Sequence, residues 1–228
     1  MQYLGGKFRI AKPLAAFLSS LRQPGQEYIE PFCGSCWVLA EMENPRRAYD
    51  IHPDLIMMWQ ALQTGWEPPE HVSEEEYAAL KNAPPSALRG FVGFATSFAG
   101  KWFGGYARGG NPNYARSGRI SNLKLAKKTQ GTVFLCADYR ILRPSGALIY
   151  CDPPYEKTTK YAFAIDHLEF WDVIRCWSSQ NTVVVSSYAA PPDFDVVWSI
   201  NTKTQLREAS GAVSPRVEKV FRWKGVKL

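Results

Sequence analysis

The sequence predicts an α/β protein with a doubly wound, mostly parallel sheet, because short apolar strands, tight turns and helices alternate at both ends of the chain. A loop over residues 3–7 and an amphipathic helix up to about Leu21 come first. The pattern then indicates a strand over residues 27–32, a tight turn, a helix over residues 36–43 and a second strand over residues 46–50. Strand, turn, helix and strand in this order open a doubly wound sheet.

The C-terminal part returns to the same pattern and supplies the rest of the sheet. Residues 147–151 are a continuous apolar run, which is typical of a parallel strand buried on both faces. Asp166 is the predicted N-cap of the helix that follows. The remaining predicted strands cover residues 132–136, 182–187, 196–200 and 217–223, the last two as a closing antiparallel pair.

Residues 64–131 interrupt this alternation. Their predicted elements are short helices over residues 73–81 and 86–99, a glycine- and arginine-rich loop over residues 100–118, and a basic helix from Ser121 to Gly131. We therefore expect a main domain made of residues 1–63 and 132–228, and an inserted region, residues 64–131, with a function of its own.

Composition limits the class of protein. Hydrophobic residues make up 46% of the 228 residues, which is enough for a folded core. No apolar run approaches the length of a membrane span, and the N-terminus lacks the pattern of a secretory signal, so we expect a cytoplasmic protein without a membrane partner. The five cysteines are scattered, and Cys33 and Cys36 lack a second pair of ligands, so we expect reduced thiols and no metal.

The distribution of charge indicates an anionic partner. No acidic residue occurs between Glu76 and Asp138, although that stretch holds nine lysines and arginines with aromatic residues and glycines between them. Such a mixture favours nucleic acid over a basic loop without a partner, because cations bind phosphates and flat side chains contact bases. The residues expected to bind DNA are Lys101, Trp102, Tyr106, Arg108, Arg116, Arg119, Lys124, Lys127 and Lys128.

A candidate catalytic motif, Asp152-Pro153-Pro154-Tyr155, follows the buried strand directly, at the strand end where open α/β sheets bind ligands. The Asp152 carboxylate and the Pro153 carbonyl can accept both hydrogens of an amine such as adenine N6, whose lone pair is otherwise delocalised into the ring. The prolines stiffen the turn, and Tyr155 offers a flat face to a base swung out of the helix. Taken alone, the motif could equally be a rigid turn.

A second candidate site follows the first predicted strands. Pro31, Phe32 and Gly34 lie in a turn whose glycine allows a nucleotide-like cofactor to approach the backbone. Asp50 ends the next strand, which is the usual place for an acid that binds ribose hydroxyls. Each signal is weak by itself, because glycine turns are common and a carboxylate at a strand end can simply cap a helix.

Four motifs in this order resemble those of the Dam-type DNA adenine-N6 methyltransferases, including the small phage forms. Residues 3–7 (Tyr-Leu-Gly-Gly-Lys) resemble the family's N-terminal cofactor motif, residues 30–35 its glycine loop, residues 48–50 its ribose-binding acid, and residues 152–155 its catalytic motif. The order is that of the α class, in which the target-recognition region lies between cofactor and catalytic motifs. The inserted region occupies that place.

The resemblance implies a Rossmann-like methyltransferase fold, S-adenosyl-L-methionine as cofactor and double-stranded DNA as partner. By position, Tyr3, Gly6 and Lys7 would hold the methionine end of the cofactor, and Pro31, Phe32 and Gly34 would line its pocket. Asp50 would bind the ribose, Asp138 the adenine, and Tyr139 would pack on that ring, with Asp152 also beside the cofactor. One departure is Cys36, where the family often has glycine.

Several alternatives remain open. The same chemistry could act on cytosine N4, on RNA adenine or on a protein amide. Aspartate at position 152 favours adenine, because cytosine enzymes favour serine and protein-glutamine enzymes favour asparagine at this position. RNA adenine stays open, since the motif contacts the base and not the sugar. A non-catalytic DNA-binding protein on the same fold is a further alternative, against which the intact motifs argue. We expect a monomer whose role, such as protection from restriction, the sequence does not identify.

Overall fold

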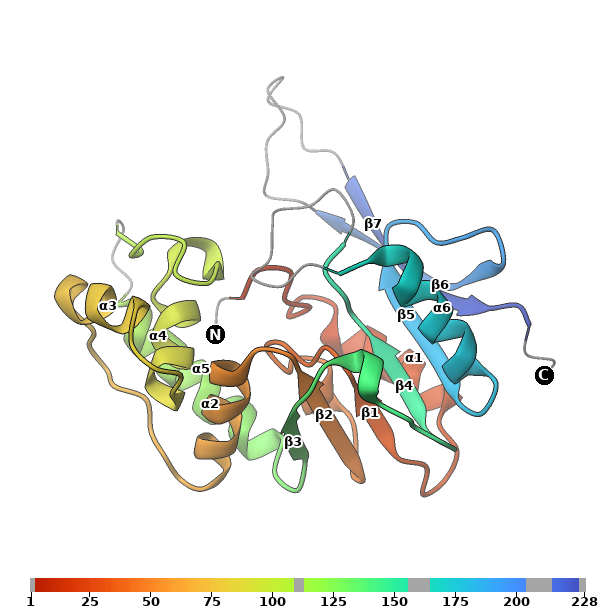
Figure 1. The fold of residues 1–228 in the computed structure, drawn as a ribbon, viewed down its shortest axis with the longest axis horizontal. Helices are drawn as coiled ribbons and strands as arrows, with labels where there is room; N and C mark the ends of the chain where they lie inside the picture. Colours follow the sequence, from red (N-terminus) through yellow and green to blue (C-terminus); the bar gives the residue numbers. More distant parts are fainter. Residues whose placement is uncertain (1–2, 109–112, 156–164, 204–214, 226–228) are drawn as a thin grey trace.

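A seven-stranded mixed sheet forms the centre of the computed structural model, which describes residues 3–108, 113–155, 165–203 and 215–225 (Figure 1). Its strands are β1 (Tyr28–Glu30), β2 (Arg46–Asp50), β3 (Val133–Cys136), β4 (Leu148–Cys151), β5 (Thr182–Ser187), β6 (Phe194–Lys203) and β7 (Pro215–Trp223). The order is β3-β2-β1-β4-β5-β7-β6, in which β1 to β5 pair in parallel and β7 is antiparallel to both neighbours. The predicted α/β fold class, a Rossmann-like sheet with antiparallel C-terminal strands, is confirmed.

The strand order reverses direction between β1 and β4, which makes the pair the switch point of the sheet. In open α/β sheets, ligands bind beside the carboxyl ends of the strands at such a point. The glycine turn follows β1, and Asp152 follows β4. The topology therefore brings the two candidate motifs to the same edge, although more than a hundred residues separate them.

Both faces of the sheet are buried, each in its own core cluster. On β4, Leu148 and Tyr150 belong to the cluster shared with α1 (Ala11–Leu21), whereas Ile149 and Cys151 belong to the cluster shared with α6 (His167–Ser178). Alternate residues of a strand point to opposite faces, so the continuous apolar run predicted for this strand is what a strand covered on both sides requires.

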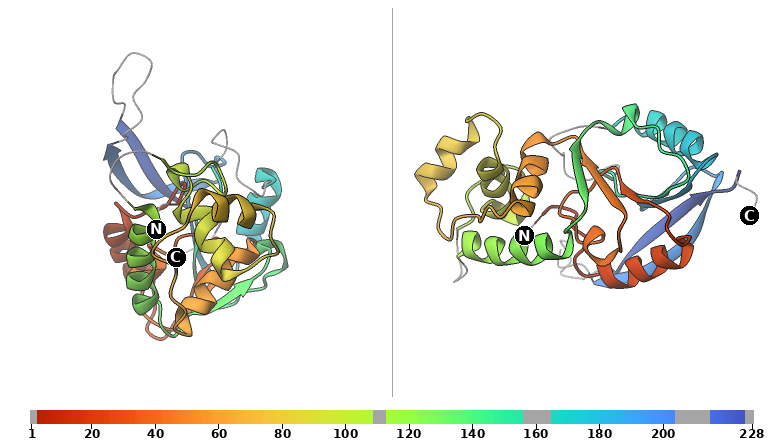
Figure 2. Two further views of the ribbon diagram at one scale, coloured as in Figure 1. Left: turned by 90° about the vertical axis from the view of Figure 1, so that its left-hand side faces the viewer. Right: turned by 90° about the horizontal axis from the view of Figure 1, so that it is seen from below.

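The remaining helices gather at the β3 end of the sheet, opposite β6 and β7 (Figures 1 and 2). They are α2 (Pro53–Gln63), α3 (Glu74–Lys81), α4 (Ala87–Ala95) and α5 (Tyr114–Lys128), with the short 3₁₀ helix η2 (Phe98–Gly100) after α4. A Cβ on Gly90 of α4 would lie 2.2 Å from the Asp54 carbonyl oxygen of α2, and Arg89 Nη1 lies 2.8 Å from Asp54 Oδ2. The core thus continues across the predicted boundary at residue 64, and the division into two domains stays a prediction.

Two predicted helices have different bounds. The helix expected over residues 36–43 is only the 3₁₀ helix η1 (Leu39–Glu41), because Cys36 has a φ of 57° that interrupts a helical path. The buried Arg46 guanidinium donates to the carbonyl oxygens of Leu39 and Met42 at the end of this short helix, at 3.0 and 2.7 Å.

The loop predicted up to residue 118 was also wrong, because α5 starts at Tyr114 and Ser121 lies inside it. Asn113 caps this helix by accepting the Arg116 N–H at 3.0 Å. Gly118 signals a close contact: a Cβ there would lie 2.7 Å from Ala95 Cβ on α4. Arg116 and Arg119 are therefore helical residues. The helix predicted over residues 86–99 likewise ends early, at Ala95.

Within the described ranges, no helix is long and apolar enough to span a membrane. All five cysteines are free thiols. In the same part of the chain, no group of three or more histidine, cysteine and acidic side chains is placed to hold a metal ion.

Candidate active site

The carboxyl end of β4 carries a cluster of charged and aromatic side chains. Lys7, from the N-terminal loop, is buried and places its Nζ 2.8 Å from Asp152 Oδ1. The same ammonium lies 4.7 Å from the centroid of the Tyr155 ring, within the range of a cation–π contact. Two motifs that are far apart in the sequence, both predicted as site residues, are therefore in direct contact.

Glu218 of β7 completes this cluster and was not predicted from the sequence. Its Oε2 accepts a hydrogen bond of 3.0 Å from the Tyr155 hydroxyl and lies 4.0 Å from Lys7 Nζ. Its Oε1 accepts one of 3.4 Å from Tyr188, whose ring meets the Tyr155 ring edge-on at 4.7 Å. A signal existed, because Glu218 shares a strand face with Val220, which is fully buried.

Electrostatics favour a basic carboxylate at Asp152. Burial raises its pKa above the ordinary value of an aspartate, and Lys7 acts in the opposite direction, while Glu218 adds to the rise. A second buried acid, Glu30 of β1, accepts a hydrogen bond of 2.7 Å from Tyr28. Burial raises the pKa of Glu30 to about 8, with Asp152 contributing to the rise. The site is therefore rich in carboxyl groups that hold protons more tightly than in water.

The glycine turn after β1 is tied to Asp50. Gly34 has a φ of 46°, a conformation that glycine adopts without strain, and its N–H donates to Asp50 Oδ2 at 3.1 Å. A Cβ on Gly34 would lie 3.0 Å from the Tyr3 ring. The Asp50 Oδ1 accepts the His52 N–H at 2.9 Å, and burial raises the pKa of Asp50 to about 6. One carboxylate thus holds both the turn and the start of α2.

Aromatic rings line the next part of the edge. The centroids of Phe32 and Tyr139 lie 5.2 Å apart, and both rings contact Phe170 of α6. Asp138 caps the 3₁₀ helix η3 (Tyr139–Ile141) and forms an ion pair with Arg140, which lowers the pKa of Asp138. The Asp138 carboxylate is therefore engaged by Arg140, which was not among the predicted site residues.

These groups form a row along one edge of the sheet. Asp138 comes two residues after β3, Asp50 ends β2, the glycine turn follows β1, and Asp152 follows β4. The four strands are consecutive neighbours. At about 4.8 Å between strands, the row spans about 14 Å, which suits an extended ligand with a nucleoside at one end and a charged group at the other.

Three of the seven predicted DNA-binding cations have acidic partners from outside the acid-free stretch. Arg108 forms two bonds to Glu74, of 2.7 and 2.5 Å, Arg119 pairs with Glu67, and Lys128 lies 2.6 Å from Glu41. Among the described residues, Arg116, Lys124 and Lys127 are exposed on α5 and have no ion-pair partner, and Lys101 is likewise exposed. The free positive charge therefore concentrates on α5.

Trp102 and Tyr106, the two aromatic residues predicted to bind DNA, pack against the helices at the β3 end of the sheet. The Trp102 ring lies 4.1 Å from the His52 ring and 4.8 Å from the Phe94 ring, centroid to centroid, and Arg89 lies over it. The Tyr106 hydroxyl donates to the Val72 carbonyl oxygen at 2.7 Å. Both rings are partly buried against the core in this structure.

Comparison with known proteins agrees with the motif arrangement. Residues 3–87 match the model of the D12 class N6 adenine-specific DNA methyltransferases. Two curated sequences named DNA adenine methylase, from two Vibrio cholerae serotype O1 strains, are 27% identical over 188 residues, which is 68% of this chain. The chain spans 64% of the length of these relatives.

Solved structures with a similar arrangement include an rRNA methyltransferase from Streptomyces viridochromogenes, at a TM-score of 0.39 and 14% identity, covering 92% of this chain and 84% of that one. Another is an rRNA methylase from Streptococcus thermophilus, at a TM-score of 0.38 and 9% identity, covering 92% and 93%. Residues 3–87 are thus similar to the D12 class N6 adenine-specific DNA methyltransferases, and the longer match is to two DNA adenine methylases.

Proposed function

We propose that this chain is a DNA adenine-N6 methyltransferase that moves a methyl group from S-adenosyl-L-methionine to a flipped-out adenine in a specific duplex site. The observation that carries the proposal is the contact of Lys7 with Asp152 at the switch point, beside the glycine turn. A cofactor motif and a catalytic motif meet there. The family match and the DNA adenine methylase relatives support the same substrate.

The residues present fit S-adenosyl-L-methionine. Gly34 has a positive φ, and its lack of a side chain leaves room for the ring of Tyr3, a residue that we assign to the cofactor. Asp50 offers a carboxylate for ribose hydroxyls, and the rings of Phe32 and Tyr139 offer an apolar wall for an adenine. Bound there, the cofactor would supply an electrophilic methyl group on a sulfonium. We assign its methionine end to the loop of Tyr3, Gly6 and Lys7, with Pro31 beside it.

Asp152 is proposed to act directly on the target amine. Its carboxylate and the Pro153 carbonyl would accept the two N6 hydrogens, which localises the nitrogen lone pair for attack on the methyl carbon. The nitrogen becomes cationic as the new bond forms and must then lose a proton. Because burial raises the pKa of Asp152, this carboxylate is a better acceptor for that proton than an exposed aspartate.

Tyr155 is proposed to stack on the flipped adenine with the ring face turned away from Lys7. Pro153 and Pro154 stiffen the backbone that carries it. Glu218 accepts a hydrogen bond from the Tyr155 hydroxyl, and Lys7 lies over the Tyr155 ring. The orientation of the ring is therefore set before the base arrives. Such preorganisation lowers the cost of reaching the transition state.

The decisive experiment incubates the purified protein with S-adenosyl-L-methionine carrying a tritiated methyl group and mixed-sequence duplex DNA, followed by digestion and identification of the labelled base. We expect N6-methyladenine. Asp152→Ala should abolish the label while duplex binding, measured by fluorescence anisotropy, remains. Label in RNA alone, or DNA binding without label despite confirmed cofactor binding, would replace the proposal with an RNA enzyme or a non-catalytic DNA-binding protein.

A further inference from the structure

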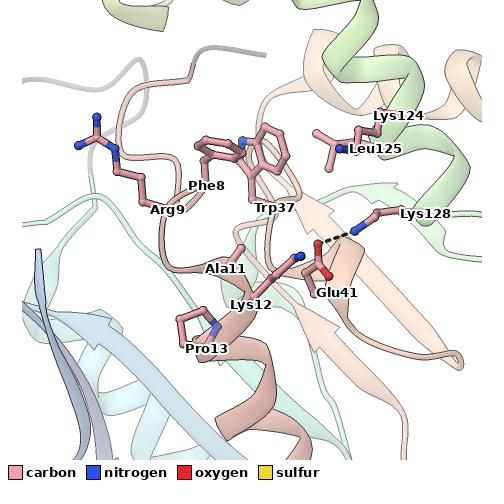
Figure 3. Close-up of a pocket in the computed structure, with 10 residues that line it drawn as sticks. All are labelled: Phe8, Arg9, Ala11, Lys12, Pro13, Trp37, Glu41, Lys124, Leu125 and Lys128. Atoms are coloured by element: carbon pink, nitrogen blue, oxygen red, sulfur yellow. Dashed lines mark hydrogen bonds and ion pairs between the residues drawn. The ribbon is translucent and has the colours of Figure 1, made fainter.

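A surface hollow lies between the start of α1 and the C-terminal half of α5, over η1 (Figure 3). Its volume is about 530 Å³. The lining residues that matter here are Phe8, Arg9, Lys12, Trp37, Lys124 and Lys128. Four of these six were not predicted to bind any partner, and they come from the main domain, not from the inserted region.

The hollow exposes an aromatic pair. The Phe8 side chain is 64% exposed, and its ring lies 4.6 Å from that of Trp37, centroid to centroid. Figure 3 shows the two rings side by side at the rim. The Trp37 ring is only partly exposed, so Phe8 supplies most of the apolar surface of the pair.

Cations surround this pair. The lining contains four of them, Arg9, Lys12, Lys124 and Lys128, and one carboxylate, Glu41, so its net charge is +3. Lys128 Nζ lies 2.6 Å from the Glu41 carboxylate, which cancels the single negative charge locally. Aromatic rings bordered by cations are typical of nucleic-acid sites.

The hollow continues into a stripe along α5. Arg116, Ile120, Lys124 and Lys127 follow at spacings of four, four and three residues, which places them on one side of a helix. All four are exposed. From Arg116 to Lys127 the stripe is about 16 Å long, so with the hollow it matches a polymer with repeated negative charges better than a single small anion.

We propose that the hollow binds the sugar–phosphate backbone of the DNA substrate, with phosphates on Lys12 and Lys124 and a deoxyribose face on Phe8. This inference rests on the proposed function. Phe8 is the neighbour of Lys7, whose side chain points to Asp152 instead. A strand held in the hollow is therefore fixed to the same loop that contacts the catalytic carboxylate, and the main domain shares DNA binding with α5.

The test measures the affinity for a short duplex by anisotropy over a range of salt concentrations, with cofactor present. Lys12→Gln combined with Lys124→Gln removes two exposed cations of the hollow. We expect the slope of log affinity against log salt to fall by about 2, since each phosphate contact contributes about 0.9. The matched control, Arg143→Gln with Lys224→Gln, removes two exposed cations elsewhere and should keep the wild-type slope.

Phe8→Ala tests the aromatic part separately. We expect affinity to fall about 5- to 10-fold with an unchanged salt slope, because a ring contact releases no counterions, and Phe8→Trp should restore it. Equal slopes for the hollow and control variants, with Phe8→Ala at wild-type affinity, would overturn the inference while methylation by the wild type upheld the proposed function. A wild type that neither binds nor methylates duplex DNA would overturn both.

Discussion

Glu218 is predicted to position the Tyr155 ring, and its removal should slow methyl transfer more than it weakens substrate binding. The Glu218 carboxylate is 15% exposed and accepts a hydrogen bond of 3.0 Å from the Tyr155 hydroxyl. A hydrogen bond to a charged group contributes about 1.5–3 kcal/mol when its surroundings exclude water. If that energy serves to hold the ring in its reactive orientation, Glu218→Ala should lower kcat by about 10- to 150-fold. Glu218→Gln retains an acceptor and should lose no more than about 10-fold.

Steady-state methylation with tritiated cofactor gives kcat and KM for each variant. A positioning role predicts a fall in kcat with KM for the cofactor near the wild-type value, whereas a merely structural role would lower the active fraction and the melting temperature. Fluorescence of 2-aminopurine at the target position reports the stacking of the flipped base independently. Asp195→Asn, which removes an exposed ion-pair partner of Lys224 on the neighbouring strand β6, is the matched control and should retain wild-type kinetics.

A double-mutant cycle decides whether the effect passes through Tyr155. Tyr155→Phe removes the hydroxyl but keeps the ring. If Glu218 acts by holding that hydroxyl, Glu218→Ala should cost little more once the hydroxyl is gone. Fully additive losses of kcat would refute the assigned contact, and a Glu218→Ala variant as active as wild type would refute the role itself.

Three further predictions concern stability. Gly90→Ala should destabilise the fold by about 1–3 kcal/mol or more in urea unfolding, because the new Cβ would lie 2.2 Å from the Asp54 carbonyl oxygen; wild-type stability would contradict the close α2–α4 packing. Cys36→Gly should stay within about 1 kcal/mol of wild type, because relief of the φ of 57° offsets the lost thiol packing and the added chain entropy, whereas the β-branched Cys36→Val should be clearly worse. Burial raises the pKa of Glu30 from 4.5 to about 8, so the stability it contributes is present below about pH 4.5 and is lost as pH rises through 8. Glu30→Gln should flatten that decline between pH 5 and pH 8, and an unchanged profile would show that the pKa of Glu30 is not raised.

Most of the sheet could be predicted, because strand signals are local. The strand over residues 46–50 has the predicted bounds, and the continuous apolar run before Asp152 is the central strand β4. The errors occurred where tertiary contacts decide. Gly118 looked like a loop residue, but it is a glycine of α5 that allows close contact with Ala95. In a single sequence, a glycine in a turn looks the same as a glycine that allows another helix to pack closely.

The candidate site was predicted in part for the same reason. The motifs identify individual residues of the site, such as Lys7 and Asp152. The fold then brings these two residues into contact. Glu218 has no motif, because its role depends on β7 entering the sheet antiparallel between β5 and β6. Its partner strand is decided by long-range pairing, which leaves only a burial pattern in the sequence.

The positive surface also depends on contacts that form only in the folded chain. A stretch without acids predicts a positive surface only if its cations do not meet acids from elsewhere in the chain. Arg108 and Arg119 meet Glu74 and Glu67, which precede the acid-free stretch and fold back onto it. The unpaired charge on Lys124 instead joins Lys12, more than a hundred residues away, at the hollow. A surface that binds a polyanion is therefore defined by the cations left after folding, and variants of Lys12 and Lys124 test DNA binding more directly than variants of Arg108 and Arg119.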